Sequence, residues 1–243
     1  MRKLKLLLGV LLVMAFSSSV FAQFTGDGFK QTVVGTHHDL TAAQGTEAAP
    51  FAGTVICEYC HTPHKFVATT GDPPLLWNQD MPTGSYTTYS SPTFDGATSV
   101  RDPSTASTAN AAAYMSLLCL TCHDGSVAIG DFKYNFDGQL GAAGSATPPD
   151  ITFGGLANDH PVDFTYSVAL ATTDGGLQSP TEGAGVAIPY VGTGNLPLFK
   201  DASADPSGRL ECATCHNPHN DTNMPFLRMD NAGSALCLNC HGA

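Results

Sequence analysis

Charged residues are scarce in this sequence, and basic residues are the scarcest. Only 13% of the residues are charged, with 10 Lys and Arg against 21 Asp and Glu. A charged fraction this low favours a protein whose surface is partly covered by other chains. The acidic excess excludes nucleic acid and anionic membrane surfaces as partners, because like charges repel, and leaves cationic partners compatible.

No apolar run is long enough to span a bilayer. The longest, Leu6 to Phe16, follows three basic residues and precedes Val20-Phe21-Ala22, a pattern typical of a cleaved secretory signal at residues 1–22. An uncleaved anchor is the alternative, whereas a lipoprotein anchor is excluded because no Cys lies near the cleavage point. The expected mature chain, residues 23–243, has no membrane span, and its formal net charge changes from −11 to −14 (7 minus 21).

No cysteine is left for a structural disulfide, because all eight lie in four Cys-x-x-Cys pairs. The pairs are Cys57 and Cys60, Cys119 and Cys122, Cys212 and Cys215, and Cys237 and Cys240. A histidine follows each pair directly: His61, His123, His216 and His241. Two thiols at this spacing can add to the vinyl groups of a haem, and the next residue then reaches the iron. Zinc is the alternative, but it does not require the following histidine. The sequence therefore predicts four haem c groups.

The four motifs form a repeat of two units, residues 57–123 and 212–241. Each unit opens with Cys-x-x-Cys-His-x-Pro-His and closes with Leu-Cys-Leu-x-Cys-His. We interpret residues 23–243 as a single domain that contains both units.

The histidine count indicates how each iron is coordinated. Four haems have eight axial positions, and the sequence has nine histidines. The histidines outside the motifs are His37, His38, His64, His160 and His219. Two imidazoles can therefore bind every iron, which closes the metal to substrate and leaves electron transfer as its chemistry. Methionine is the competing ligand, and we assign the methionines to packing.

The positions of these histidines suggest specific roles. His64 and His219 each lie three residues beyond a motif histidine, too close to reach the far face of the same haem. We expect each to bind the other haem of its own unit. His160, in the turn Asn158-Asp-His-Pro161, is also expected to be a ligand. Of His37 and His38, one is a ligand and the other is spare, and the turn predicted at Asp39 favours His38.

The remaining sequence predicts mostly coil, with a few short helices and little β structure. The clearest helix runs from Asn110 to Leu120, and a second short one precedes His241. Short strands are expected within 162–166 and 186–191, and 66–109 is expected to be an irregular loop. Trp77, the single tryptophan, is expected to pack against haem, with an electron-relay role as the alternative. Haem should supply most of the core, so the protein without haem should be largely unfolded.

Several motifs together resemble the doubled Cys-x-x-Cys-His cytochromes. They are His38-Asp-Leu40, Cys57 to His64, Pro74-Leu-Leu-Trp-Asn78, Leu118 to Gly125, Asn158 to Pro161 and Cys212 to His241. One Leu before Trp77 is additional to the family pattern. The chain is similar to extracellular tetrahaem cytochromes of the OmcE type, which polymerise into filaments and take one axial histidine from the neighbouring subunit.

The resemblance implies a secreted protein, extracellular or on the cell surface, that assembles head to tail with copies of itself. Its other implied partners are redox proteins and extracellular electron acceptors. A soluble periplasmic electron shuttle is the alternative. A multihaem reductase is a second, enzymatic alternative, but it needs an iron with an open face. The sequence has no unusual proximal residue and has histidines to spare, which favours a protein that is not an enzyme.

Overall fold

The described chain consists mainly of coil with short helices and strands. The computed structural model describes residues 33–41, 56–62, 77–80, 82, 86–96, 115–124, 132, 156–181, 187–189, 195–199 and 207–242. The helices are η2 (Ile56–Tyr59), α2 (Met115–His123), α3 (Val168–Asp174), α4 (Cys212–Cys215), η6 (Ala232–Ser234) and α5 (Ala235–Leu238). The strands are β1 (Phe164–Tyr166), β2 (Ala187–Pro189), β3 (Asn195–Pro197) and β4 (Gly208–Leu210). This content confirms the predicted fold class.

Helix α2 confirms the predicted helix at the second motif, but it extends further along the chain than predicted. It runs through the whole motif to His123, and its buried side includes Leu117 and Leu120. Thr121 donates its side-chain hydroxyl to the Leu117 carbonyl at 2.9 Å, an i to i−4 bond that a helix accommodates. The predicted N-cap Asn110, the signal at 1–22 and His64 lie outside the described residues.

Helix α3 was not predicted, and local capping explains it. The Ser167 hydroxyl accepts a hydrogen bond from the Leu170 N–H at 3.0 Å, which satisfies a donor that the first turn leaves free. Gly175 ends the helix at φ 73°, and its N–H bonds the Ala171 carbonyl. A non-glycine residue is strained in this left-handed conformation. The spacing between Ser167 and Gly175 could have predicted this helix from the sequence, whereas apolar periodicity could not.

Two small antiparallel sheets position the C-terminal half. Strand β1 pairs with β4, with Phe164 opposite Leu210, and β2 pairs with β3, with Ile188 opposite Leu196. Strands β1 and β2 lie within the two ranges predicted from alternation. Strand β1 lies before both of the last two motifs in the sequence, and β4 directly precedes the third motif. The first sheet therefore ties the segment between the second and third motifs to the start of the third.

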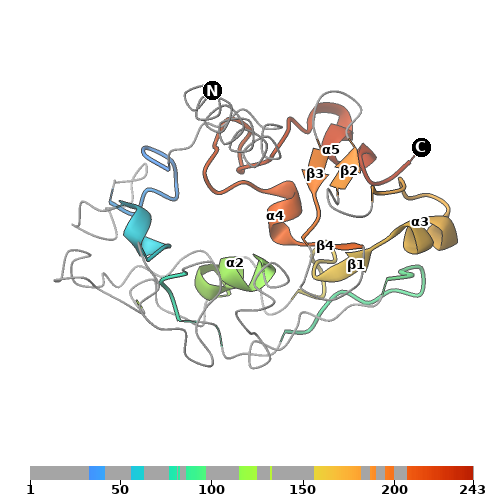
Figure 1. Cartoon of the computed structure of the whole chain (residues 1–243), viewed down its shortest axis with the longest axis horizontal. Helices are drawn as coiled ribbons and strands as arrows, with labels where there is room; N and C mark the ends of the chain where they lie inside the picture. The colour runs from blue at the N-terminus through green and yellow to red at the C-terminus, as the bar shows by residue number, and fades with distance from the viewer. Residues whose placement is uncertain are drawn as a thin grey trace, which may run out of the picture.

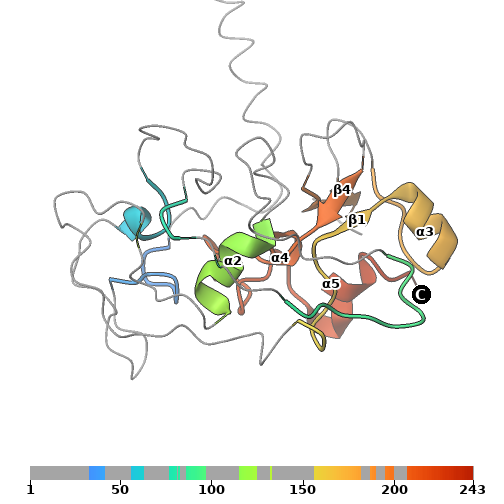
Figure 2. The ribbon, with the colours of Figure 1, turned by 90° about the horizontal axis from the view of Figure 1, so that it is seen from below.

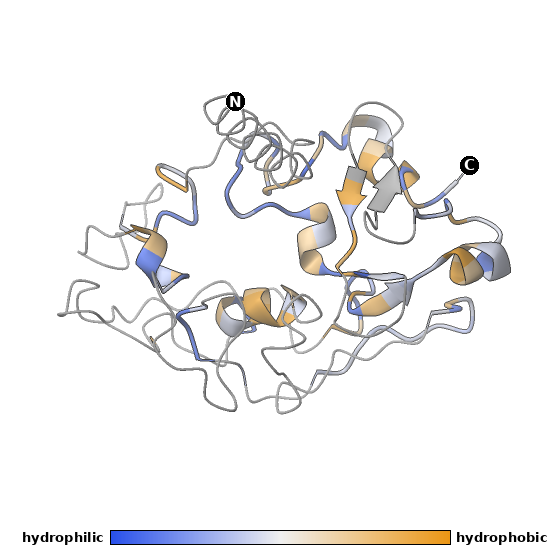
Figure 3. Cartoon of the chain, viewed as in Figure 1, coloured by the Kyte–Doolittle hydropathy of each residue, from blue (hydrophilic) through white to orange (hydrophobic). Residues whose placement is uncertain are grey.

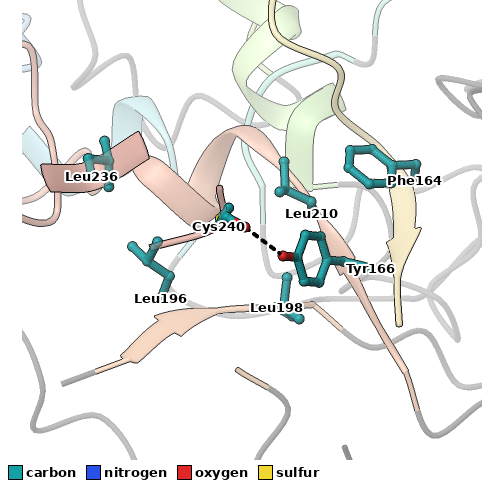
Figure 4. Close-up of a cluster of buried hydrophobic side chains, with 7 residues drawn as sticks. All are labelled: Phe164, Tyr166, Leu196, Leu198, Leu210, Leu236 and Cys240. Atoms are coloured by element: carbon teal, nitrogen blue, oxygen red, sulfur yellow. Dashed lines mark hydrogen bonds between the residues drawn. The ribbon is translucent and has the colours of Figure 1, made fainter. Parts of the chain in front are cut away.

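An apolar core surrounds the fourth motif, which the sequence analysis did not foresee. Figure 4 shows the cluster, which consists of Phe164, Tyr166, Leu196, Leu198, Leu210, Leu236 and Cys240. The Tyr166 hydroxyl donates to the Cys240 carbonyl at 3.5 Å and to the Gln178 carbonyl at 2.8 Å. Side chains from both sheets thus pack directly against a motif cysteine.

The motif elements follow one another along the longest axis of the molecule. Figure 1 shows η2, α2, α4 and α5 in that order from left to right, and the view turned by 90° in Figure 2 shows the same order. Figure 3 shows apolar residues on α2 and β3, whereas the loop that follows α4 is largely polar. Chain order and spatial order therefore coincide for the four motifs.

The β1–β4 core should contribute measurably to stability. Leu210 is 2% exposed, so Leu210→Ala removes buried methyl groups and leaves a cavity, at a cost of about 2–5 kcal/mol of unfolding free energy. Urea unfolding of the haem-loaded protein measures this. Val168→Ala at a 40% exposed position is the control and should change stability by less than about 0.5 kcal/mol. Equal effects of the two substitutions would mean that haem alone holds this region together.

Candidate functional site

Three of the four Cys-x-x-Cys-His motifs fold as a single helical turn. In each, the N–H of the motif histidine donates to the carbonyl of the first cysteine, with distances of 2.8 Å at His61, 3.0 Å at His216 and 2.9 Å at His241. This i to i−4 bond places the first cysteine and the histidine on one face of the turn. The remaining motif, the second along the chain, ends at His123 within the longer helix α2.

A short antiparallel segment, which we call a strap, lies beside each of these three turns. Each strap forms an isolated bridge with the motif histidine: Trp77 with His61, Leu227 with His216, and Leu177 with His241. The following strap residue donates its N–H to the carbonyl of the second motif cysteine, at 2.8 Å from Asn78, 2.9 Å from Arg228 and 2.8 Å from Gln178. The straps therefore hold the backbone of each motif histidine in place.

The strap of the first motif also reaches the residues between its two cysteines. The Asn78 side chain donates to the Glu58 carbonyl at 2.6 Å, and the Gln79 side chain donates to the Tyr59 carbonyl at 2.7 Å. Both amides are buried, so these bonds satisfy polar groups that water cannot reach. The Trp77 ring lies 5.9 Å from His61 in a T-shaped contact, which puts its indole beside the first motif.

The imidazoles lie in facing pairs, each of which joins a motif histidine to a histidine outside the motifs. The ring centres are 6.1 Å apart for His123 and His38, 6.2 Å for His61 and His219, and 6.3 Å for His241 and His160. None of these pairs is close in the sequence, so the fold brings them together.

This spacing fits an iron held between two imidazoles. A metal–imidazole nitrogen bond is about 2 Å long, and the centre of a five-membered ring lies about 1.1 Å from its atoms, so two rings on opposite faces of one metal have centres about 6.2 Å apart. The motif thiols on the same turns are free of disulfides, as thioether attachment requires. The residues present therefore fit haem c, with one imidazole for each face of the iron.

Backbone carbonyls orient several of these rings. Nδ1 lies 3.3 Å from the Pro218 carbonyl in His38, 2.9 Å from the Pro161 carbonyl in His160, and 2.8 Å from the Pro225 carbonyl in His216. A carbonyl oxygen can only accept, so Nδ1 carries the proton and Nε2 keeps its lone pair. Metal-binding histidines commonly donate their other ring N–H to a backbone carbonyl in this way.

The electrostatic environment keeps His38 neutral. Burial, and after it the charge of the neighbouring His123, lowers its pKa to about 4. A metal binds only the neutral imidazole, so His38 is ready to ligate across the physiological pH range. The buried Asp39 fixes the adjacent turn, because its carboxylate accepts from the Gly35 N–H at 2.9 Å and from the Thr41 hydroxyl at 2.6 Å.

The observed pairs differ from the assignment made from the sequence. His219 faces His61 of the first unit, whereas we expected it to serve the other haem of its own unit. His38 faces His123, the position expected for His64, which lies outside the described residues. The rule of sharing within a unit considered only distance along the chain, and the fold places the loop after the third motif beside the first. His37 is exposed.

A buried polar network connects the second motif to the third. Glu211 is completely buried, and one of its carboxylate oxygens accepts from the N–H of Ser116 at 3.1 Å and from its hydroxyl at 2.5 Å. The Ser116 hydroxyl in turn accepts from the Cys212 N–H at 3.0 Å. The thiols of Cys119 and Cys212 are close neighbours, because each shifts the pKa of the other. Helices α2 and α4 are thus joined where their first cysteines lie.

The sequence analysis missed Glu211 and Ser116 as site residues. Both residues lie close before a Cys-x-x-Cys-His motif in the sequence, and this position could have drawn attention to them. A single Glu or Ser in a sequence, however, does not indicate that the side chain is buried. Of the methionines that we assigned to packing, Met229 packs against the core of the fourth motif, whereas Met224 is 51% exposed.

Within the residues that the structure describes, no three His, Cys, Asp or Glu side chains converge as a metal cluster. Nor is any helix within the described parts long and apolar enough to cross a membrane.

Comparison with known proteins relates the C-terminal part of the chain to a described family pattern. The family pattern described as the doubled CXXCH motif matches residues 205–243, which contain the third and fourth motifs. No curated protein matches the chain. The family match and the motif geometry support a multihaem c-type cytochrome with covalently bound haem c.

Glu211 should make stability depend on pH. Burial raises its pKa well above the usual range, and the charge of Asp163 raises it further. A carboxyl whose pKa is higher in the folded chain stabilises the fold below the unfolded pKa of about 4.3, and this contribution is lost as the pH rises. Glu211→Gln keeps an oxygen for Ser116 but cannot ionise. Wild-type stability should therefore fall relative to the variant between pH 4 and 8, as measured by urea unfolding. A constant difference across this range would contradict the assignment.

Proposed function

We propose that this chain is an electron-transfer protein that holds four c-type haems, each between two histidines, and that it assembles into extracellular filaments. The observation that carries the proposal is the set of three facing imidazole pairs at 6.1, 6.2 and 6.3 Å. Each pair contains one Cys-x-x-Cys-His histidine, so attachment and ligation coincide at the same three places.

Two imidazoles per iron favour electron transfer over catalysis on substrate. When bound, haem supplies a reversible one-electron change at iron. His38, His160 and His219 occupy the side opposite a motif histidine, so no face of those three sites remains for a substrate. The protein's task is then to hold the rings in place, which the straps and the Nδ1 contacts to carbonyls support.

The repeat suggests the ligand of the third motif. Both units open with Cys-x-x-Cys-His-x-Pro-His, and the second histidine of the second opening, His219, faces His61 of the first. By the same exchange between units, we assign His64 of the first opening as the second ligand of the haem whose motif histidine is His216. This set uses eight histidines of one chain and leaves His37 over, so it does not require the ligand from a neighbouring subunit that the resemblance implies.

Electrons can pass between the two units at two places in this arrangement. His219 ligates in the first unit but lies in the loop that begins at His216, so one short loop serves both sites. The second place is the contact of the Cys119 and Cys212 thiols, from which the edges of two haems would extend. The two units therefore act as one electron path.

Several features support assembly and export. The first cysteines of the outermost motifs, Cys57 and Cys237, are exposed, and these motifs lie at opposite ends of the row of motif elements in Figure 1. A head-to-tail contact between such ends propagates without closing. The low charged fraction and the secretory signal predicted at 1–22 from the sequence fit a secreted subunit.

His219 provides a direct test of ligation. His219→Ala removes one of the two axial imidazoles at the first motif, so one haem in four should become high-spin in the ferric electron paramagnetic resonance spectrum. His37→Ala is the matched control and should leave all haems low-spin, because His37 is left over in the proposed set. A low-spin spectrum in His219→Ala would contradict the ligand role.

A combined variant locates the affected haem. If His219 serves the first motif, then Cys57→Ser with Cys60→Ser removes that haem, and adding His219→Ala should give no new high-spin signal. A high-spin signal that persists in this background would assign His219 to a different haem, such as that of the fourth motif.

Electron micrographs of the secreted, haem-loaded protein test the filament. We expect unbranched filaments in the medium and four haems per chain by pyridine haemochrome assay. Dispersed particles under native conditions, with four haems present, would contradict the filament and favour a soluble shuttle.

A further inference from the structure

The three straps differ in charge at one equivalent position, and only the strap of the third motif has a cation there. This inference rests on the proposed function. We infer that Arg228 raises the reduction potential of the third-motif haem, which is attached through Cys212 and Cys215. The neutral residues at the same position, Asn78 in the first motif and Gln178 in the fourth, do not raise the potentials of their haems. Arg228 is thus a positioning residue that also tunes potential.

The equivalence of the three positions rests on matching hydrogen bonds. Asn78, Gln178 and Arg228 each follow the residue that is bridged to a motif histidine, and each donates its N–H to the second cysteine's carbonyl. On the other side of the bridge, the Asn217 N–H donates to the Phe226 carbonyl at 2.8 Å, and the Gly242 N–H donates to the Gly176 carbonyl at 2.7 Å. The third and fourth motifs therefore share the same backbone hydrogen-bond arrangement on both sides of the bridge.

The side chain at this position can also reach into the turn between the cysteines. The Arg228 Nε–H donates to the Ala213 carbonyl at 2.8 Å, and the Asn78 side chain donates to the Glu58 carbonyl at 2.6 Å. Ala213 and Glu58 both directly follow the first cysteine of their motif. The guanidinium is therefore held against the turn that attaches the third-motif haem.

The charge of Arg228 acts on the surrounding site. The Arg228 N–H donates to the carbonyl of Cys215 at 2.9 Å, so the residue that carries the cation contacts the cysteine that attaches the third-motif haem. Arg228 and Cys215 are half-buried, where water and salt screen a charge less than at an exposed site.

A fixed cation changes a haem potential in a known direction. Ferric haem has one more positive charge than ferrous haem, so a nearby cation disfavours the ferric form and raises the potential. Neutral Asn78 and Gln178 lack this effect. The protein thus has a means of making its third site the preferred place for an electron, between the first unit and the fourth motif.

The test uses the chain's own neutral residue as its model. Arg228→Gln gives the third strap the residue of the fourth, and Gln178→Arg makes the reciprocal change at an exposed position. Midpoint potentials are measured by spectroelectrochemistry of the haem-loaded protein, with haem-methyl NMR to identify each haem. Haem content and low-spin absorption are recorded separately, so that loss of haem or ligand, which would count against the proposed function, is distinguished from a shift in potential.

We expect Arg228→Gln to lower the third-motif potential by about 59 mV, which is a tenfold change in the reduction equilibrium for one electron. Arg228→Lys should retain most of the wild-type value, and Gln178→Arg should raise the fourth-motif potential. Unchanged potentials in fully loaded Arg228→Gln, or an equal fall in Arg228→Lys, would overturn the inference. If Arg228→Gln does not load haem, Gln178→Arg decides at low ionic strength, where screening at its exposed position is weakest, and the absence of a rise there overturns the inference.

Discussion

The pairing of imidazoles across distant parts of the chain is the constraint on which the rest of this structure depends. The pairs join residue 38 to 123, 61 to 219, and 160 to 241, so each connects segments that helices and strands do not. A chain with such short regular elements buries little surface through them, and its backbone entropy must be offset elsewhere. In the proposed function, an iron between each pair, with thioether bonds to the same turns, would supply that connection, and loading with haem would then be part of folding.

The same pairs make the two repeated units dependent on each other. Because His219 faces His61, the first unit is completed only by a loop of the second. The buried network of Glu211 and Ser116 reinforces this connection by joining α2 to α4 beside the contacting thiols of Cys119 and Cys212. The electron path that we propose between the units would therefore coincide with the contacts that hold the units together. Loss of either contact should affect both stability and transfer.

The strap extends the internal repeat beyond its recognisable sequence. The three straps have little sequence in common: they are Trp77-Asn78, Leu177-Gln178 and Leu227-Arg228, and only the leucine is shared by two of them. The strap at Leu177 also lies about sixty residues before its motif, whereas the other two follow theirs. They are equivalent because any residue with a free N–H can make the backbone bonds of an antiparallel bridge. The side chain at the second position is consequently free to vary, and in Arg228 this variation adds a charge beside a haem site.

The sequence by itself determined the chemistry of this protein and little of its geometry. Cys-x-x-Cys-His is a local pattern, so the attachment turns, the helix at the second motif and the histidine count could be derived without a structure. The coil content and two strand positions also followed from composition and alternation. Which imidazole faces which could not be derived, because His219 is three residues from His216 in the chain yet faces His61 across the fold. The buried Glu211, the core around Cys240 and the straps are likewise products of long-range packing, in which residues far apart in the sequence occupy one site, and only the tertiary structure decided them.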